Sequence, residues 1–303
     1  MIDLARSIEL TRIQGNGEKG DWSLVLNQDY TSLVATLSIQ SFTDLYNLAG
    51  GVAVKEQKDR SVLRFEIGDA VFFLKRHESE KKQPGGILDG TDYPWCSEGG
   101  KEFAFFYGFR QVGLATAHPV AMGEEILKDG TVQSFFLTED FAPYVQLEDL
   151  IRHTPDVLAG EKNKTKRLNI LKAVGEYARR MHGTGFNHQD FNATHVLLHG
   201  FEKGVPNMAL FDLQRVDQRV WQRFRWPIKA LAEFNYSIRE NDVFSDGERL
   251  FLFHVYCDKV DQLLNPVEKM QWRWIEAKTN KIARHTAKRH ARNRKRREKS
   301  SLR

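Results

Sequence analysis

Short apolar runs separated by polar or glycine-containing stretches mark the first half of this chain. Runs of this length and composition are typical of β-strands. One of them ends close to Lys75, and a helical pattern that opens at Lys101 and Glu102 follows it. The runs that we interpret as strands span residues 22–26, 33–37, 52–54, 62–67, 69–75 and 134–138.

A regular apolar spacing of three and four residues predicts a long helix over residues 164–185. Gly183 and Gly185 end this helix and deliver the chain to His188. A short apolar strand over residues 196–198 comes next, so the segment around His188 is a loop between a helix and a strand. Two further helices are predicted over residues 228–236 and 247–256.

Composition is that of a soluble globular protein, because 41% of the 303 residues are hydrophobic and 28% are charged. No apolar run approaches the length of about 18 residues that a membrane span needs. The first residues lack a basic stretch followed by an apolar one, so no signal peptide is visible. Cys96 and Cys257 are too few and too far apart for a disulfide framework or a zinc site. These features favour the reducing cytoplasm.

Positive charge is concentrated at the end of the chain. Residues 281–303 hold 11 Lys and Arg against Glu298 alone, a net charge of +10, whereas the other 280 residues hold 34 basic and 39 acidic side chains, a net charge of −5. The apolar residues of 267–283 predict a helix that continues into this basic tail. A basic terminus is often simply solvated or an arm for nucleic acid. It also suits an electrostatic tether to an anionic membrane, where each Lys or Arg contributes on the order of 1 kcal/mol.

Residues 187–215 carry the clearest chemical pattern. Asp190 follows His188 by two positions, His195 stands five residues after Asp190, and Asp212 ends an apolar run 22 residues beyond Asp190. Protein kinases place an acceptor-orienting Asp, a residue at the Asp-plus-five position and a metal-binding Asp in this order. The pattern therefore predicts an ATP- and Mg²⁺-dependent phosphotransferase.

Three upstream residues stand in the order that a kinase requires. Lys75 lies near the end of a strand and would hold the phosphates of ATP, and Glu102 would pair with Lys75. Glu139 follows a strand and would bring backbone groups of a hinge to adenine. Alone, each residue has a common structural explanation, but the ordered set favours the functional interpretation. We expect an α+β, protein-kinase-like fold with a small β-rich lobe over 1–140 and a helical lobe over 141–280.

Much of the chain, roughly residues 50 to 290, resembles the lipopolysaccharide core heptose kinases of the WaaP type within the wider lipopolysaccharide kinase family. The resemblance rests on the segments described above, on Asp-Leu-Gln-Arg at 212–215 and on residues 225–237. The family usually shows His-Arg-Asp, and Gln189 here replaces the Arg. The resemblance implies phosphorylation of an inner-core heptose of lipopolysaccharide. It also implies a lipid-linked core oligosaccharide as acceptor, at the inner face of the cytoplasmic membrane.

The sequence leaves several alternatives open. The resemblance places His195 at the metal with Asp212, but Mg²⁺ prefers oxygen ligands, so a phosphate contact is a second role for this imidazole. Gln189, His195 and a poor glycine loop, for which Gly50–Gly51 is the only candidate, fit a pseudokinase or ATP-binding module. A kinase for Kdo, a protein or another small molecule is a further alternative. Binding of nucleic acid is disfavoured, because the complete kinase set is retained.

Overall fold

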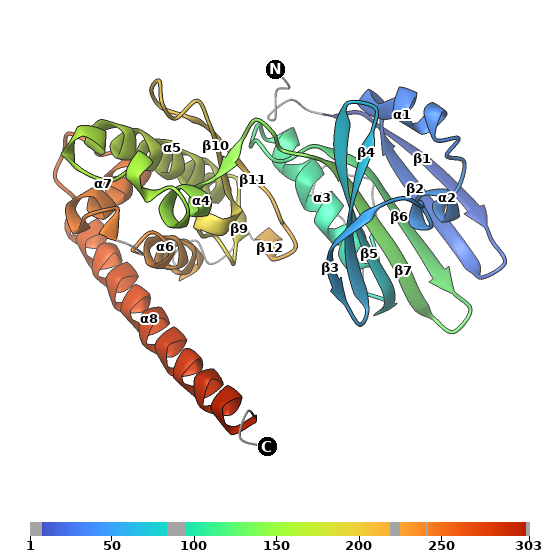
Figure 1. Ribbon diagram of the computed structural model, residues 1–303. Coiled ribbons are helices and arrows are strands. Elements are labelled where there is room, and N and C mark those ends of the chain that lie inside the picture. The colour runs from blue at the N-terminus through green and yellow to red at the C-terminus, as the bar shows by residue number, and fades with distance from the viewer. Residues whose placement is uncertain (1–7, 84–94, 219–224, 240–241, 301–303) are drawn as a thin grey trace. The chain divides into compact units, whose positions relative to one another are not determined.

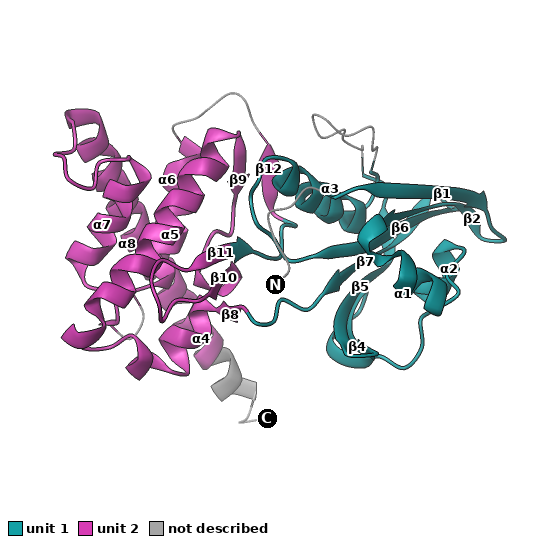
Figure 2. Cartoon of the chain, turned by 90° about the horizontal axis from the view of Figure 1, so that it is seen from above, with its two compact units in different colours: residues 1–143, 209–214 teal, residues 144–208, 215–303 magenta. Residues whose placement is uncertain are grey.

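The chain folds into two compact units, which Figure 2 shows in different colours. Unit 1 comprises residues 1–143 and 209–214, and unit 2 comprises residues 144–208 and 215–303. Unit 1 therefore includes six residues around Asp212 that the sequence places with the helical lobe. Residues 79–100 contain many glycine and polar residues, which predicts a long loop; residues 84–94 of this range lie outside the described residues, and its ends belong to β5 (Ala70–Lys81) and α3 (Glu98–Gln111). The computed structural model describes residues 8–83, 95–218, 225–239 and 242–300.

Unit 1 is built on one antiparallel sheet of seven strands, in the order β1-β2-β6-β7-β5-β4-β3 (Figure 1). The runs over residues 52–54 and 62–67 form a hairpin, because β3 pairs with β4, and β5 carries Lys75 between β4 and β7. The strands are β1 (Leu10–Asn16), β2 (Gly20–Asn27), β3 (Val52–Gln57), β4 (Arg60–Ile67), β5 (Ala70–Lys81), β6 (Pro119–Leu127) and β7 (Thr131–Glu139).

The two faces of this sheet bury different helices. Successive side chains of a strand point to opposite faces, and β7 shows the result. Phe135 packs against Phe42 of α2 (Phe42–Tyr46) at a ring distance of 5.6 Å. Phe136 packs against Phe103 and Phe106 of α3 (Glu98–Gln111) at 5.9 and 5.0 Å. On β5, the same alternation sends Leu74 to the core beneath α2 and leaves Lys75 on the side of α3.

Two predictions about unit 1 are wrong in detail. Residues 33–37 belong to helix α1 (Thr31–Thr36) and its end, not to a strand. Leu33, Val34 and Leu37 are spaced to face one side of a helix, and they pack against the core of the sheet. Glu102 does not begin its helix, because Ser97 caps α3 with a side chain that accepts a hydrogen bond from the backbone N–H of Gly100.

Unit 2 is mainly helical, and α5 (Lys164–Gly183) and α7 (Asp246–Tyr256) pack closely against each other. A Cβ added at Gly175 would come within 2.9 Å of the side chain of Val255, so this position requires glycine for the helices to approach. All three predicted helices are confirmed, with α6 (Arg225–Ser237) as the third. The remaining short elements are β8 (Val145–Gln146), α4 (Leu147–Arg152), β9 (Phe186–His188), β10 (Val196–His199), β11 (Asn207–Leu210) and β12 (Val216–Gln218).

The predicted helix at the end of the chain is confirmed and forms one element, α8 (Pro266–Ser300). Its first half is anchored to the unit, because Trp272 packs against Phe253 at 5.6 Å and Ile275 is buried. Asn235 of α6 donates to the hydroxyl of Thr279 at 3.1 Å. The far end of α8 extends beyond the rest of unit 2 (Figure 1). Across the described ranges, none of the helices is both long enough and apolar enough to span a membrane.

Candidate active site

Lys75, Glu102 and Asp212 form a charged cluster in unit 1. The ammonium nitrogen of Lys75 lies 2.6 Å from Oε1 of Glu102 and 3.7 Å from Oδ1 of Asp212. The strand alternation of β5 and the Ser97 cap of α3 bring the first two residues together. Asp212 arrives at the end of β11, beyond a short parallel bridge between Leu210 and Thr116. The structure thus brings together three residues that the sequence selected, the first and last of which are 137 positions apart.

Glu102 is the most buried member of this cluster, because none of its side chain is exposed. Burial raises the pKa of its carboxyl group, while the neighbouring ammonium of Lys75 acts to lower that pKa. Its second oxygen, Oε2, has no hydrogen-bond partner among the described residues. A buried carboxylate with a single close cation holds that cation firmly, since separating the pair would leave an uncompensated charge.

Asp212 combines strain with access to solvent. Its backbone adopts a left-handed conformation with φ of 59°, which Asp and Asn tolerate better than most residues. Strained backbone of this kind is frequent at functional sites. About a third of its side chain, 33%, is exposed, so a carboxylate oxygen is accessible while the residue stays beside Lys75. Such a carboxylate is a suitable ligand for Mg²⁺, which needs one or two protein carboxylates when phosphates supply further oxygens.

In unit 2, Asp190 is held in the loop between β9 and β10. Its backbone N–H donates to Nδ1 of His188 at 3.1 Å. Its two carboxylate oxygens accept hydrogen bonds from Nη1 of Arg215 at 2.8 and 2.9 Å. The pairing of β9 with β12 sets Val216 opposite His188 and so brings Arg215 to the loop. The role of Arg215 was not foreseen, although the residue closes the Asp-Leu-Gln-Arg segment.

Gln189 adds two hydrogen bonds between the Asp190 loop and residues 215–217. Its backbone N–H donates to the carbonyl oxygen of Arg215 at 2.8 Å, and its side-chain amide donates to Asp217 at 2.6 Å. Asp190 itself receives a guanidinium from Arg215, 25 residues further along the chain. The replacement of Arg by Gln leaves Asp190 with a cationic partner.

His195 lies directly against the Asp190 segment, at the end of a 3₁₀ turn over Ala193–His195. Its Nδ1 is 2.8 Å from the carbonyl oxygen of Asp190. A carbonyl oxygen can only accept, so Nδ1 carries the proton and, in the neutral ring, Nε2 keeps a lone pair. This tautomer is the one that metal-binding histidines use. The ring also stacks on His188, with the two centroids 5.3 Å apart.

Glu139 ends β7 and accepts a hydrogen bond from the hydroxyl of Tyr30. The backbone N–H of Glu139 donates to the backbone carbonyl oxygen of His118 at 3.0 Å. The backbone N–H of Asp140 donates to the backbone carbonyl oxygen of Val71 at 2.8 Å. These two N–H groups are occupied within unit 1. The predicted contact with adenine therefore depends on other backbone groups of the hinge.

The Gly50–Gly51 pair has a structural explanation of its own. A Cβ at Gly51 would lie 2.5 Å from the ring of Phe65, so the absence of a side chain lets the chain pass close to the core. Gly50 has φ of 88° between α2 and β3. The turn of the β3–β4 hairpin is formed instead by Lys58 and Asp59.

The candidate residues thus form two groups, each within one unit. Lys75, Glu102, Glu139 and Asp212 belong to unit 1, whereas Asp190 and His195 belong to unit 2. Among the described residues, no three His, Cys, Asp or Glu side chains converge as a metal site made by protein alone would require. A metal ion at Asp212 would therefore depend on oxygen ligands from a bound nucleotide.

Comparison with known proteins shows consistent similarity. The model of the lipopolysaccharide kinase (Kdo/WaaP) family matches residues 51–256. The lipopolysaccharide core heptose(I) kinase WaaP of Escherichia coli is 31% identical over 212 residues, which cover 65% of this chain and 74% of that protein. The enzyme of the same name from Pseudomonas aeruginosa is 26% identical over 246 residues, covering 77% and 86%.

A solved structure of WaaP in complex with acyl carrier protein has a similar fold. It aligns with a TM-score of 0.64 and 23% identity, covering 86% of this chain and 98% of the solved one. At this identity the likeness shows the fold alone. Together with the antiparallel sheet and the helical unit, it confirms the predicted α+β class.

Proposed function

Because this chain belongs to the lipopolysaccharide kinase (Kdo/WaaP) family, we propose that it transfers a phosphoryl group from ATP to a hydroxyl of an inner-core heptose. The family makes the chain an ATP-dependent phosphotransferase with an alcohol group as acceptor. The choice of heptose rests on the names of the E. coli and P. aeruginosa relatives. The observation that carries the proposal is the cluster of Lys75, Glu102 and Asp212.

The residues of unit 1 fit a nucleotide with its metal. Lys75 presents a charge that Glu102 fixes in place, and Asp212 presents an accessible carboxylate 3.7 Å from that charge. We assign Lys75 to the α- and β-phosphates, Asp212 to Mg²⁺, and the hinge at Glu139 to adenine. Bound ATP supplies the transferable phosphoryl group, and Mg²⁺ offsets the negative charge that develops during transfer.

In unit 2, Asp190 is the candidate for orienting the acceptor hydroxyl and accepting its proton. Its side chain is 31% exposed, and both oxygens contact a partner, Arg215, that is itself 59% exposed. An exposed pair of this kind is worth little energy. An acceptor hydroxyl can therefore displace Arg215 from one oxygen of Asp190 at small cost.

His195 would act beside Asp190 through its second nitrogen. The hydrogen bond from Nδ1 to the backbone of Asp190 fixes the ring and its tautomer, in which Nε2 is the nitrogen that keeps a lone pair. This geometry supports a contact with the metal or with a phosphate, the two roles that the sequence left open. Substitution by Asn, which offers an oxygen and an N–H, would tell them apart. Retained Mg²⁺ dependence with a higher KM for ATP favours the phosphate contact.

The proposed function is tested by incubating the protein with purified core oligosaccharide, ATP and Mg²⁺, and by measuring the mass of the product. We expect the gain of one phosphate on a heptose, and no gain with the variant Asp190→Asn. If phosphate appears on Kdo instead, or on a protein or small molecule in parallel assays, the protein is a kinase with a different acceptor. Binding of ATP without any transfer would replace the proposal by a pseudokinase.

We also propose that the end of α8 holds the protein to an anionic membrane. Residues 291–303 carry seven Lys and Arg against Glu298. Nearer its start, α8 exposes Val267, Met270 and Trp274, which are spaced to share one side of the helix. Aromatic residues with one polar end favour membrane interfaces. Charge and exposed apolar surface on one helix support a peripheral position at the inner face of the cytoplasmic membrane.

Deletion of residues 291–303 tests this partner. We expect unchanged turnover of a soluble, delipidated acceptor and reduced activity on acceptor embedded in anionic vesicles. The deficit should shrink in high salt, which screens the tether of the intact protein. The competing partner is an acidic protein, such as the acyl carrier protein bound in the solved WaaP structure. Binding of that protein, with no binding to vesicles, would overturn the membrane proposal.

A further inference from the structure

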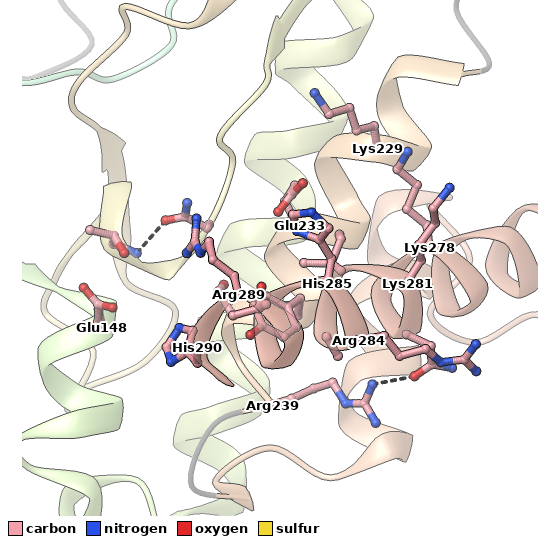
Figure 3. Close-up of a pocket in the computed structure, with 18 of the residues that line it drawn as sticks. Glu148, Lys229, Glu233, Arg239, Lys278, Lys281, Arg284, His285, Arg289 and His290 are labelled. Carbon is pink, nitrogen blue, oxygen red and sulfur yellow. Dashed lines mark hydrogen bonds between the residues drawn. The ribbon is translucent and has the colours of Figure 1, made fainter. Parts of the chain in front are cut away.

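A cationic groove lies in unit 2 beside the Asp190 loop. We call it the basic groove. It has a volume of about 1220 Å³, and α4, α6, α8 and the loop residues Asn192 and Thr194 form its walls. Figure 3 shows Glu233, His285 and Arg289 near its centre, with Lys229 and Lys278 toward one side.

The lining of the basic groove is strongly positive. Seven Lys and Arg side chains face two Glu side chains, which gives a net charge of +5 when His285 and His290 are neutral. The part of the chain before residue 281 has the opposite sign, with a net charge of −5. The charge of the groove is therefore a local feature. Its basic members are Arg152, Lys229, Arg239, Lys278, Lys281, Arg284 and Arg289.

Most of these cations have no carboxylate partner. Arg152 pairs with Glu148 at 2.9 Å, and Arg239 donates to the side chain of Asn280 at 2.8 Å. The other five have no carboxylate at ion-pair distance among the described residues, although Lys229 and Lys278 act electrostatically on Glu233. Like charges in one concave surface repel each other and create a field that attracts anions. The groove is thus prepared for a ligand with several negative charges.

The cations are mounted on a fixed helix, not on a loose terminus. Lys278, Lys281, His285 and Arg289 follow one another at three- and four-residue intervals, so they share one side of α8. Thr279 fixes the register of this helix, because its hydroxyl bonds both the side chain of Asn235 and the backbone of α6. The first part of the basic tail is therefore a wall of the groove.

The basic groove adjoins the residue proposed to orient the acceptor. The backbone N–H of Ala193, three residues after Asp190, donates to the hydroxyl of Ser237 in the groove at 2.9 Å. Burial raises the pKa of Glu233, with Lys229 acting to lower it and Asp190 acting to raise it. Glu233 thus lies within electrostatic range of both the groove and Asp190.

We propose that the basic groove binds carboxylate or phosphate groups of the acceptor, on sugars next to the one that is phosphorylated. This inference rests on the proposed function and adds the chemical class of the acceptor. The phosphates of ATP are assigned to Lys75 in unit 1, so they do not explain a second cationic site. A concave wall that includes the loop of Asp190 suits an oligosaccharide better than a flat lipid surface.

The double variant Lys281→Gln/Arg289→Gln tests the groove without removing the helix. Lys269→Gln/Arg273→Gln is the matched control, because it removes one Lys and one Arg from exposed positions of α8 outside the groove. With a soluble, delipidated acceptor, we expect the groove variant to raise the KM for acceptor about ten-fold. Its kcat and its KM for ATP should stay within about two-fold of those of the intact protein, as should every constant of the control.

An unchanged KM in the groove variant, or an equal rise in the control, would overturn the inference. Equilibrium dialysis without ATP separates it from the proposed function. If the acceptor binds through the groove but is not phosphorylated, the proposed function is wrong and the inference about the groove stands. Acceptor that has lost its phosphates and whose carboxylates have been reduced should bind weakly to all variants. If inorganic phosphate alone binds as tightly as the acceptor does, the acceptor is not the specific ligand of the groove.

Discussion

Two ion pairs of nearly the same length lie in the two groups of candidate residues, one in each unit, yet their surroundings differ. Lys75 and Glu102 in unit 1 lie 2.6 Å apart, with 17% and 0% of their side chains exposed. Arg215 and Asp190 in unit 2 lie 2.8 Å apart, with 59% and 31% exposed. Distance alone would rank the pairs as equal.

Burial decides what each pair is suited to do. The Lys75–Glu102 pair cannot separate without leaving a buried charge, so it fixes a cation where phosphates are to bind. The Asp190–Arg215 pair is accessible to water and can be exchanged for another partner at little cost. The ion pair of unit 1 is rigid, whereas the ion pair of unit 2 is open to substitution by an acceptor.

The largest effect is expected for Asp212, the carboxylate beside the rigid pair. Asp212→Asn should abolish turnover, because an amide is a poorer ligand for Mg²⁺ than a carboxylate. Assays over a range of Mg²⁺ and Mn²⁺ concentrations check the cause, since partial rescue by excess metal is expected. Full activity of the intact protein without any divalent ion would contradict the assignment and the kinase mechanism with it.

Substitution of Asp190, which belongs to the exchangeable pair, should slow the transfer step without changing the affinity for ATP. Asp190→Asn keeps the size of the side chain but removes its basicity, so kcat should fall roughly 10²–10⁴-fold. The dissociation constant of ATP, measured by calorimetry, should remain unchanged. If kcat were unaltered, Asp190 would have no part in the transfer step.

Glu102→Gln tests the rigid pair against an exposed pair of the same length. Without the charge of Glu102, Lys75 loses its positioning partner, and kcat/KM for ATP should fall roughly ten-fold or more. Glu66→Gln is the control, because Glu66 contacts Arg64 at the same 2.6 Å but is 66% exposed. Steady-state kinetics with ATP as the varied substrate should show no effect of the control. Equal losses in both variants would mean that burial is irrelevant.

The contrast between buried and exposed groups extends to histidine and pH. Burial lowers the pKa of His182 to about 3, below its ordinary value of 6.5. Between pH 6.5 and about 3, His182 is therefore protonated in the unfolded chain but neutral in the folded chain. The free energy of unfolding consequently falls as the pH falls through this range. His182→Gln should flatten the decline of Tm below pH 6.5.

The smallest effect is expected for Arg215, the exposed partner of Asp190. Arg215→Gln should change the free energy of unfolding by less than about 1 kcal/mol, as is usual for exposed pairs. Urea denaturation measures this change, with Arg64→Gln as a second exposed example. A loss of several kcal/mol would show that the pair is structural and that the comparison between the two ion pairs is wrong.

Local patterns in the sequence predict most of unit 1 and the helices of unit 2, because strand alternation and helical spacing are properties of neighbouring residues. Lys75 could be placed on its strand for this reason. The helix over residues 31–36 was missed, since Leu33, Val34 and Leu37 fit more than one pattern in so short a run.

Contacts between distant segments lie beyond such patterns. The bond between Arg215 and Asp190 depends on the pairing of β9 with β12, and the bond between Tyr30 and Glu139 joins residues 109 positions apart. The basic groove likewise exists only because Thr279 sets the register of α8 against α6. Composition revealed a basic tail but could not divide it into a wall of a groove and a projecting end.

The projecting end of α8 has a consequence for its own helicity. Lys288, Arg292 and Arg296 stand four residues apart, and like charges at this spacing destabilise a helix. Residues 287–294 are exposed, so little burial offsets this repulsion there. Helix content there should rise when polyanions or salt neutralise the charges, and far-UV circular dichroism of a peptide spanning 284–303 would record it. The final turns of the chain can therefore act as a reporter of the anions around them.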